Sequence, residues 1–145
     1  MAESRKFLRV VLIVLTMFLA LTALAGGIAL LFGWNTPSTE LLAGTIFHDY
    51  TVPGLTLFIV VGGSALASSL LLIRKSRFAD IFAIASGIII MCFEFGEVLI
   101  IGSPPGPALV MQLFYFVLGS LMVIVTLGLQ FFDLLHEKKE SHRGE

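Results

Sequence analysis

Two glutamates, Glu94 and Glu97, interrupt the otherwise apolar stretch 81–101. A carboxylate inside a membrane costs about 3 kcal/mol or more unless it is protonated, paired or hydrated, so its presence requires a reason. Their spacing of three places both side chains on one face of a helix. Two carboxylates this close in a low-dielectric site cannot both ionise cheaply, and such a pair is suited to proton exchange or to cation binding.

Gln112 and Tyr115 are the partners that the sequence offers for these carboxylates. At 1.5 Å per residue, Glu97 and Glu94 lie about 8 and 12 Å from the outer end of their segment. Gln112 and Tyr115 lie at nearly the same depths in the next, antiparallel segment, and both can donate hydrogen bonds to a carboxylate. We therefore expect one polar cluster of these four residues. It is either a hydrogen-bonded clasp between two helices or a functional site for a proton, a cation or a polar ligand, in which Glu97 is the ionised member and Glu94 the protonated one.

The first loop, residues 35–53, is long and mixes apolar with polar residues. We expect it to form a short helix in the membrane interface or to cap the mouth of the bundle. His48 and Asp49 could join Glu94 and Glu97 in an outward-facing site, but no recognised metal-ligand spacing links the four. The alternative is a solvated turn, and we expect no metal and no cofactor. The aromatic residues expected at headgroup level are Trp34, Phe47 and Tyr50.

Enzyme classes are disfavoured by missing partners. No apolar segment holds a serine with a histidine, as an intramembrane hydrolase dyad would require. His136 and His142 fall outside the apolar segments, so a buried bis-histidine haem site is not expected. Cys92 is the only cysteine, which excludes an intrachain disulfide and a CxxC pair. A glycine-rich phosphate motif is also missing, and we expect no catalytic residue.

Membrane-spanning helices must position these residues. The chain is 57% hydrophobic and 13% charged, with a mean hydropathy of +1.01, whereas soluble domains are about a quarter charged. Four apolar segments reach the roughly 20 residues that cross a hydrocarbon core of about 30 Å; they are 10–32, 52–73, 81–101 and 108–132. The predicted fold is all-α: a polytopic four-transmembrane-helix bundle in one domain, 1–136, followed by a charged, solvated tail, 137–145.

The basic residues predict the orientation. All nine lysines and arginines fall on one side of the four segments, whereas the first loop carries Glu40 and Asp49. Cytoplasmic loops are enriched in lysine and arginine, so both termini are expected in the cytoplasm. The first segment resembles a signal peptide around residues 23–25, but its apolar run continues to Phe32, and we expect an uncleaved helix. The basic residues are Arg5, Lys6, Arg9, Arg74, Lys75, Arg77, Lys138, Lys139 and Arg143.

Each segment carries a face of small or polar residues at helical spacing. Helices associate in lipid through close packing at small residues and through occasional hydrogen bonds, so these faces are expected to form the bundle interior. In the first segment they are Thr16, Ala20, Ala23 and Gly27; in the second, Gly62, Gly63, Ser64, Ala65, Ala67, Ser68 and Ser69; in the third, Ala79, Ala83, Gly87, Glu94 and Glu97; and in the fourth, Gln112, Tyr115, Gly119, Thr126 and Gln130.

The Pro53-Gly54 opening of the second segment, the acidic stretch 93–102 and the four-span layout resemble a family of small, uncharacterised four-helix bacterial inner-membrane proteins. The resemblance covers most of the chain. It implies the architecture and a bacterial inner membrane, and it carries over no catalytic residue.

The function expected from these observations is that of a non-catalytic accessory or interaction subunit, which associates with itself or with a larger membrane complex. The first alternative is an oligomeric transporter or channel for a proton-coupled or cationic solute that uses Glu94 and Glu97. The second is binding of a lipid or another small ligand between the helices. The lipid bilayer is the expected surrounding, and a net charge of -1 does not favour a nucleic-acid partner.

Overall fold

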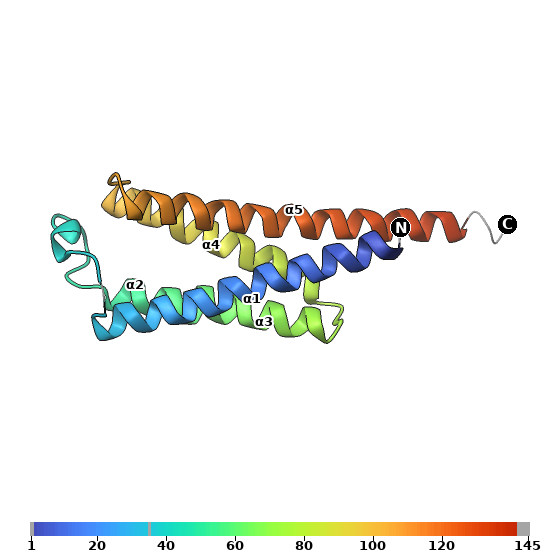
Figure 1. Ribbon diagram of the computed structural model, residues 1–145, viewed down its shortest axis with the longest axis horizontal. Coiled ribbons are helices and arrows are strands. Elements are labelled where there is room, and N and C mark those ends of the chain that lie inside the picture. Colours follow the sequence, from blue (N-terminus) through green and yellow to red (C-terminus); the bar gives the residue numbers. More distant parts are fainter. Residues whose placement is uncertain (1, 35, 142–145) are drawn as a thin grey trace.

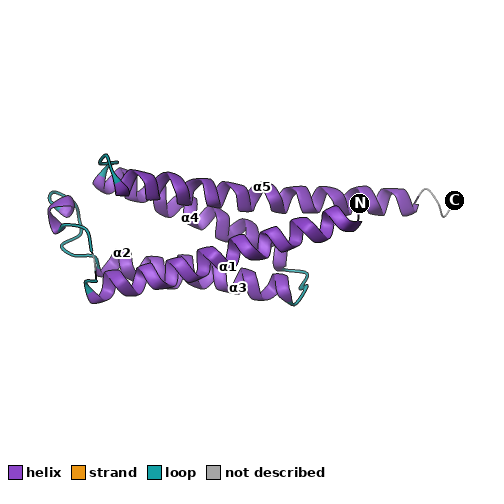
Figure 2. Ribbon diagram, in the orientation of Figure 1, coloured by secondary structure: helices purple, strands orange, loops and turns teal. Residues whose placement is uncertain are grey.

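The computed structural model describes residues 2–34 and 36–141, and this part of the chain contains helices and no strand (Figure 2). One continuous helix is made of α2 (Thr51–Leu55), η2 (Thr56–Gly62) and α3 (Gly63–Ile73), and its middle part, η2, has the wider hydrogen bonding of a π-helix. The elements in chain order are α1 (Ala2–Phe32), η1 (Thr39–Leu42), α2 (Thr51–Leu55), η2 (Thr56–Gly62), α3 (Gly63–Ile73), α4 (Ala79–Ile101) and α5 (Pro107–Ser141).

Four helices are long and apolar enough to cross a membrane: α1, the continuous helix of α2, η2 and α3, and the helices α4 and α5. The prediction of an all-α fold with four apolar spans is confirmed. Glycine and proline set the turn between α4 and α5. Gly102 ends α4 with a φ of 74°, a conformation that favours glycine, and Pro107 begins α5, where its missing N–H costs no hydrogen bond.

Two helices extend further than expected. α1 begins at Ala2 instead of near residue 10, and α5 continues to Ser141, so the described part of the charged tail is helical and exposed at Glu137 and Lys138. Glutamate and lysine are good helix formers, and they continue a helix that the apolar span has already nucleated. Residues 142–145, with His142 and Arg143, lie outside the described part of the chain.

Packing between the spans joins two helical hairpins into one bundle (Figure 1). α1 lies along the second span and α4 lies along α5, while contacts of α3 with α4 and of α1 with α5 connect the two pairs. We call the end that carries the first loop and the α4–α5 turn the loop end; it lies on the left in Figure 1. The terminal end carries the start of α1, the α3–α4 turn and the last turns of α5.

The small-residue faces of the first, third and fourth spans form the interior of the bundle, as predicted. In the second span the prediction holds in part: Gly62, Ala65, Ser68 and Ser69 are buried, whereas Gly63, Ser64 and Ala67 are half-buried. Thr16, Ala20, Ala23 and Gly27 of the first span are all buried. Leu12 and Leu19 are buried with them, whereas Val14, Phe18 and Leu21 are exposed. A buried hydrogen bond, from the Ser69 hydroxyl to the Thr16 hydroxyl at 3.0 Å, links α3 to α1. The face predictions for the third and fourth spans are confirmed by the burial of Ala79, Ala83, Gly87, Glu94, Gln112, Gly119 and Thr126, with Glu97, Tyr115 and Gln130 half-buried.

Two glycines hold α4 and α5 in backbone contact near the middle of the bundle. A Cβ added to Gly119 would lie 2.6 Å from the carbonyl oxygen of Gly87 and 2.7 Å from Cγ2 of Ile90. No side chain fits at either position without separating the helices. This contact sets the distance between the helix that carries the glutamates and the helix that carries Gln112.

Candidate functional site

The two glutamates lie on the inner face of α4, and Gln112 faces them from α5. Glu94 is buried, with 6% of its surface exposed, and Glu97 is half-buried. The Gln112 amide nitrogen donates to Oε1 of Glu97 at 3.1 Å and to the carbonyl oxygen of Gly102 at 3.1 Å. Both amide hydrogens are therefore used, and the side chain ties the end of α4 to α5. The hydrogen bond expected between Gln112 and the carboxylate pair is confirmed.

The expected cluster of four residues forms only in part. Tyr115 makes no side-chain hydrogen bond within the described chain, and its ring packs edge-on against Phe114 with centroids 5.3 Å apart. Glu94 likewise accepts no hydrogen bond from the described residues, and the Gln112 amide oxygen is buried without a donor there. Buried polar atoms are normally satisfied. The Gln112 amide oxygen therefore lacks a donor, which a water or a ligand can supply.

Glu94 and Tyr115 border a partly open cavity between the four spans, which we call the central cavity. Its volume is about 220 Å³, and all four spans contribute to its wall. Glu94, Glu97 and Tyr115 are thus brought to one space, although they do not bond to one another. The lining residues are Thr22, Ala23, Gly26, Leu57, Ile90, Phe93, Glu94, Glu97, Met111 and Tyr115.

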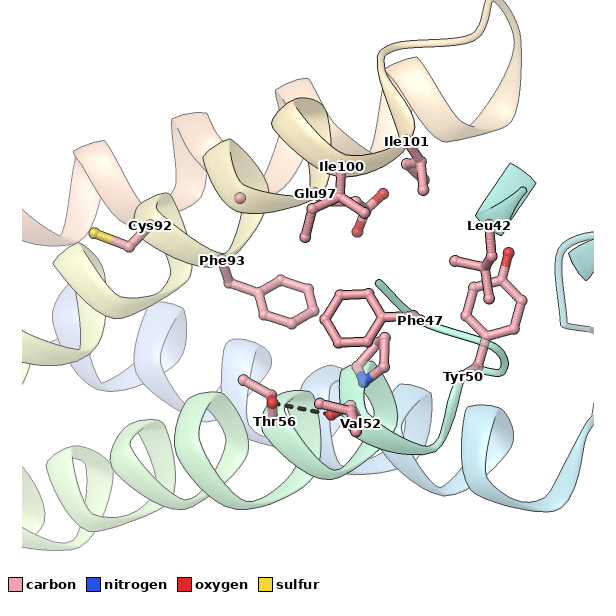
Figure 3. A pocket seen from close by; sticks show the side chains of 12 residues that line it. Leu42, Phe47, Tyr50, Val52, Thr56, Cys92, Phe93, Glu97, Ile100 and Ile101 are labelled. Atoms are coloured by element: carbon pink, nitrogen blue, oxygen red, sulfur yellow. Dashed lines mark hydrogen bonds between the residues drawn. The ribbon is translucent and has the colours of Figure 1, made fainter. Parts of the chain in front are cut away.

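A second space, the loop-end cavity, lies between the first loop, the start of the second span and α4. Its volume is about 210 Å³, and Figure 3 shows Phe47 and Phe93 reaching into it from the loop and from α4. Both cavities include Phe93 and Glu97 in their walls, so these two residues separate them. The lining residues are Leu42, Phe47, Tyr50, Val52, Pro53, Thr56, Cys92, Phe93, Gly96, Glu97, Ile100 and Ile101.

The loop-end cavity is apolar except at Glu97 and two hydroxyl groups. The Thr56 hydroxyl donates to the Val52 carbonyl oxygen at 2.9 Å, and the Tyr50 hydroxyl donates to the Ser38 carbonyl oxygen at 3.1 Å. Burial and, to a lesser extent, the negative charge of Glu97 raise the pKa of Tyr50 above its ordinary value. Tyr50 is therefore a neutral phenol, and Glu97 is the one carboxylate in this apolar wall.

The first loop caps this cavity, which is one of its two expected arrangements. η1 is a single 3-10 turn whose Ser38 hydroxyl accepts from the backbone N–H of Glu40 at 3.2 Å. Leu42, at its end, is buried and covers the cavity. Trp34, by contrast, is exposed and stacks on Phe32 with ring centroids 5.4 Å apart.

His48 and Asp49 do not join the glutamates. Both are exposed and neither borders a cavity that holds Glu94 or Glu97. The Asp49 carboxylate instead accepts from the backbone N–H of Thr51 at 2.9 Å, where the second span begins. The interpretation as a shared outward-facing site is therefore wrong, and the solvated turn is confirmed. Within residues 2–34 and 36–141, no group of three or more histidine, cysteine, aspartate or glutamate side chains could hold a metal ion.

Sequence reasoning missed the aromatic contribution to the site. Phe47 and Tyr50 were expected at headgroup level as membrane anchors, but they line the loop-end cavity with Phe93. Phe93 faces inward and Phe95 is 59% exposed, although both flank Glu94 in the chain. The helical period distinguishes them, because Phe93 lies beside Ile90 and Glu97 on the inner face.

Comparison with known proteins adds no assignment. No known family matches the chain, and no curated protein or solved structure is detectably similar to it.

Proposed function

We propose that this chain is an integral membrane protein that binds an amphipathic cation, an apolar molecule with an ammonium group, at the two cavities beside Glu97. The observation that carries the proposal is the position of Glu97 in both walls, with an aromatic, apolar space on one side and Glu94 on the other. No lysine or arginine lies in the loop half of the bundle. An ammonium group is the missing counter-charge, and an apolar tail fits the space between Phe47 and Phe93.

The chemistry of the walls favours a cation over a neutral or anionic ligand. Carboxylates in a low-dielectric site are stabilised in their charged form by a cation within about 4–6 Å. Aromatic faces add an attraction of about 0.5–2 kcal/mol for an ammonium group. An anion would meet Glu94 and Glu97 without any compensating positive charge. This role corresponds to the small-ligand alternative drawn from the sequence, with the carboxylates as its polar anchor.

Transport across the membrane receives less support than binding. The polar face of α5 continues to Thr126 and Gln130, but Leu118 and Met122 lie between them and the central cavity and are buried. The Gly87–Gly119 backbone contact closes the same level of the bundle. A pathway for a solute would need a second copy of the chain or a rearrangement of α4 against α5.

Three ligands that share one alkyl chain test the proposal: decylammonium, decanol and decanoate. In lipid nanodiscs, decylammonium is expected to raise the unfolding temperature of the protein, and the other two are not. Glu97→Gln should abolish the shift and Glu94→Gln should reduce it, because an amide has no charge. Glu40→Gln, which removes an exposed carboxylate of η1, is the matched control and should respond like the wild type.

Two results contradict this function. Equal stabilisation by decanol would show that only the apolar tail is recognised. A Glu94→Gln/Glu97→Gln double variant that folds and keeps the full response would show that the carboxylates only clasp α4 to α5.

A second candidate function, an accessory or self-associating subunit, is supported by a shallow groove on the outside of α4 and α5. Gly96 lies in it with no atom within 4 Å of the position of a Cβ, so the glycine is not required by packing within the chain. Small residues at a lipid-facing surface allow another helix to approach closely. The groove is lined by Ile88, Met91, Cys92, Phe95, Gly96 and Phe116.

Cys92 provides the test without any substitution, because it is the only cysteine and is exposed in this groove. Oxidation in native membranes is expected to give a disulfide-linked dimer, and Gly96→Leu should prevent it. Recovery of only monomer, together with the absence of a co-purifying complex in mild detergent, would overturn this candidate.

We also infer that the terminal end is cytoplasmic and that the membrane is a bacterial inner membrane. The eight basic residues that the structure describes all lie at that end, which supports the orientation, and the resemblance to four-helix inner-membrane proteins supports the location. In a Cys92→Ala background, Ser38→Cys should react with an impermeant thiol reagent in intact cells and Ser76→Cys should not. The opposite labelling pattern would reverse the orientation.

A further inference from the structure

A third cavity, the terminal-end cavity, lies where three separate parts of the chain meet: the start of α1, the α3–α4 turn with the start of α4, and α5 beyond its apolar span. Its volume is about 280 Å³. Charged side chains make up most of its wall, in contrast to the two cavities near Glu97. The charged lining residues are Arg5, Arg9, Lys75, Arg77, Asp80 and Asp133.

The wall holds four cationic and two acidic side chains, and the acids do not neutralise the cations. Arg5 pairs with Asp133, with Nε and Oδ1 2.7 Å apart. Arg9, Lys75 and Arg77 form no ion pair with the described residues.

Asp80 lies near Arg9 without an ion pair. An excess of positive charge therefore remains around the cavity after the possible pairs are counted.

One of these cations, Arg9, has an unused hydrogen-bond donor. The Nε of Arg9 is buried and has no hydrogen-bond partner in the described chain, although buried donors are normally satisfied. Lys75, with a φ of 54°, is the left-handed residue that ends α3: its N–H bonds the Leu72 carbonyl oxygen at 3.2 Å, and the N–H of Ser76 bonds the Leu71 carbonyl oxygen at 2.9 Å. This turn brings Lys75 into the wall of the cavity. Arg77 is held differently, with its guanidinium carbon 4.7 Å from the centre of the Phe78 ring.

The level of the cavity along the bundle indicates what approaches it. Arg9 immediately precedes the apolar run of α1, Lys75 lies between two spans, and Asp133 follows the apolar run of α5. The cavity therefore lies at the boundary of the hydrocarbon core, where lipid phosphates are found. Basic pockets between helices at this level are suited to phosphate head groups, and arginine matches phosphate with planar paired donors.

We infer that the terminal-end cavity binds a phosphate group, carried by an anionic lipid or by a free phosphate-containing solute. The buried Nε–H of Arg9 and the ammonium group of Lys75 are its donors, with Arg77 at the rim. Asp80 opposes the anion, and the larger number of cations outweighs it. This inference does not depend on the cation site near Glu97.

The experiment measures the unfolding temperature of the full chain in neutral detergent. Phosphatidylglycerol, phosphatidylcholine and inorganic phosphate are titrated separately. Phosphatidylglycerol is expected to stabilise the wild type at lower concentration than phosphatidylcholine does. Arg9→Gln and Lys75→Gln should each raise the half-maximal concentration about tenfold, because a charge-assisted hydrogen bond is lost. Arg74→Gln removes the same charge from the same turn, outside the cavity, and should leave the titration unchanged.

The three titrations distinguish a free phosphate from the phosphate of a lipid, and the variants show whether the cavity binds either. Stabilisation by inorganic phosphate that is lost in Arg9→Gln assigns the site to a free phosphate, and stabilisation by phosphatidylglycerol alone assigns it to lipid. An equal loss in Arg74→Gln, or none in the two cavity variants, would overturn the site. Lys75→Gln changes an exposed turn, so it keeps the test valid if Arg9→Gln fails to fold.

Discussion

The loop half and the terminal half of this bundle place charge in opposite ways. The loop half holds a buried glutamate, Glu94, and a half-buried one, Glu97, on one helix, and an amide donates to Glu97. The terminal half surrounds its acids with a larger number of cations. Cations at the end of a span reach water and lipid phosphates at low cost, but a carboxylate inside a span does not. The terminal-end charges are therefore stable without a ligand, whereas the burial of Glu94 lowers the stability of the fold, and a bound cation would offset that cost.

The largest expected effect comes from Gly119→Leu, which should disturb the packing of α4 against α5 in both halves of the bundle. The nearest neighbour of any side chain at this position is the backbone carbonyl of Gly87, which cannot move aside without separating α4 from α5. We expect a loss of about 3 kcal/mol in the free energy of unfolding. Chemical unfolding in detergent measures it. Gly96→Leu, at a glycine with open space around it, is the matched control and should change stability by less than about 1 kcal/mol.

The next effect has the opposite sign. Glu94→Leu is expected to stabilise the protein by about 1–2 kcal/mol, because it replaces a buried group that has no hydrogen-bond partner in the described chain. Asp133→Leu at the terminal end is expected to destabilise it by up to about 1 kcal/mol, because a partly exposed pair with Arg5 is lost. Thermal unfolding of both variants gives the comparison directly. A lower unfolding temperature for Glu94→Leu would mean that Glu94 supports the fold.

The sequence was sufficient for those features of the site that depend on one helix or on depth in the membrane. A period of 100° per residue placed Glu94 and Glu97 on the inner face of their helix. Counting 1.5 Å per residue from the segment ends brought Gln112 to the level of Glu97. The hydrogen bond between Asp49 and Thr51 could also have been predicted, since aspartate commonly accepts from the backbone N–H two residues later.

Features that depend on packing between distant segments were not predictable. The loop-end cavity requires Phe47 to fold back toward Phe93, and no periodicity encodes the path of an irregular loop. The terminal-end cavity collects Arg9 and Asp133 from opposite ends of the chain, and it forms only because α1 crosses α5. The π-helical stretch η2 departs from the period of 3.6 on which helix prediction rests.

A double-mutant cycle compares one side-chain link to a carboxylate in each half. The coupling between Glu97→Ala and Gln112→Ala is expected to be about 1–2 kcal/mol, because a part-buried hydrogen bond to a carboxylate is lost. The coupling between Arg5→Ala and Asp133→Ala should not exceed about 1 kcal/mol, because nearly half of the Arg5 side chain is exposed. Added salt should weaken only the second coupling. A Glu97–Gln112 coupling near zero would show that this hydrogen bond does not stabilise the packing of α4 against α5.

The smallest effect concerns a carboxylate of the loop end that lies outside the spans. The backbone N–H of Thr51 bonds the Asp49 carboxylate and holds its pKa below the ordinary value of 3.8. A lowered pKa stabilises the folded protein above the unfolded value, and the contribution is lost as the pH falls through the folded value. The unfolding temperature of the wild type should therefore drop slightly more than that of Asp49→Asn between about pH 5 and pH 3. Asparagine keeps the acceptor oxygen and cannot titrate, whereas Asp49→Ala removes the acceptor and should be less stable throughout this range. Identical pH profiles for the wild type and Asp49→Asn would show that the charge of Asp49 does not contribute, and that this end of the second span is held by the neutral hydrogen bond alone.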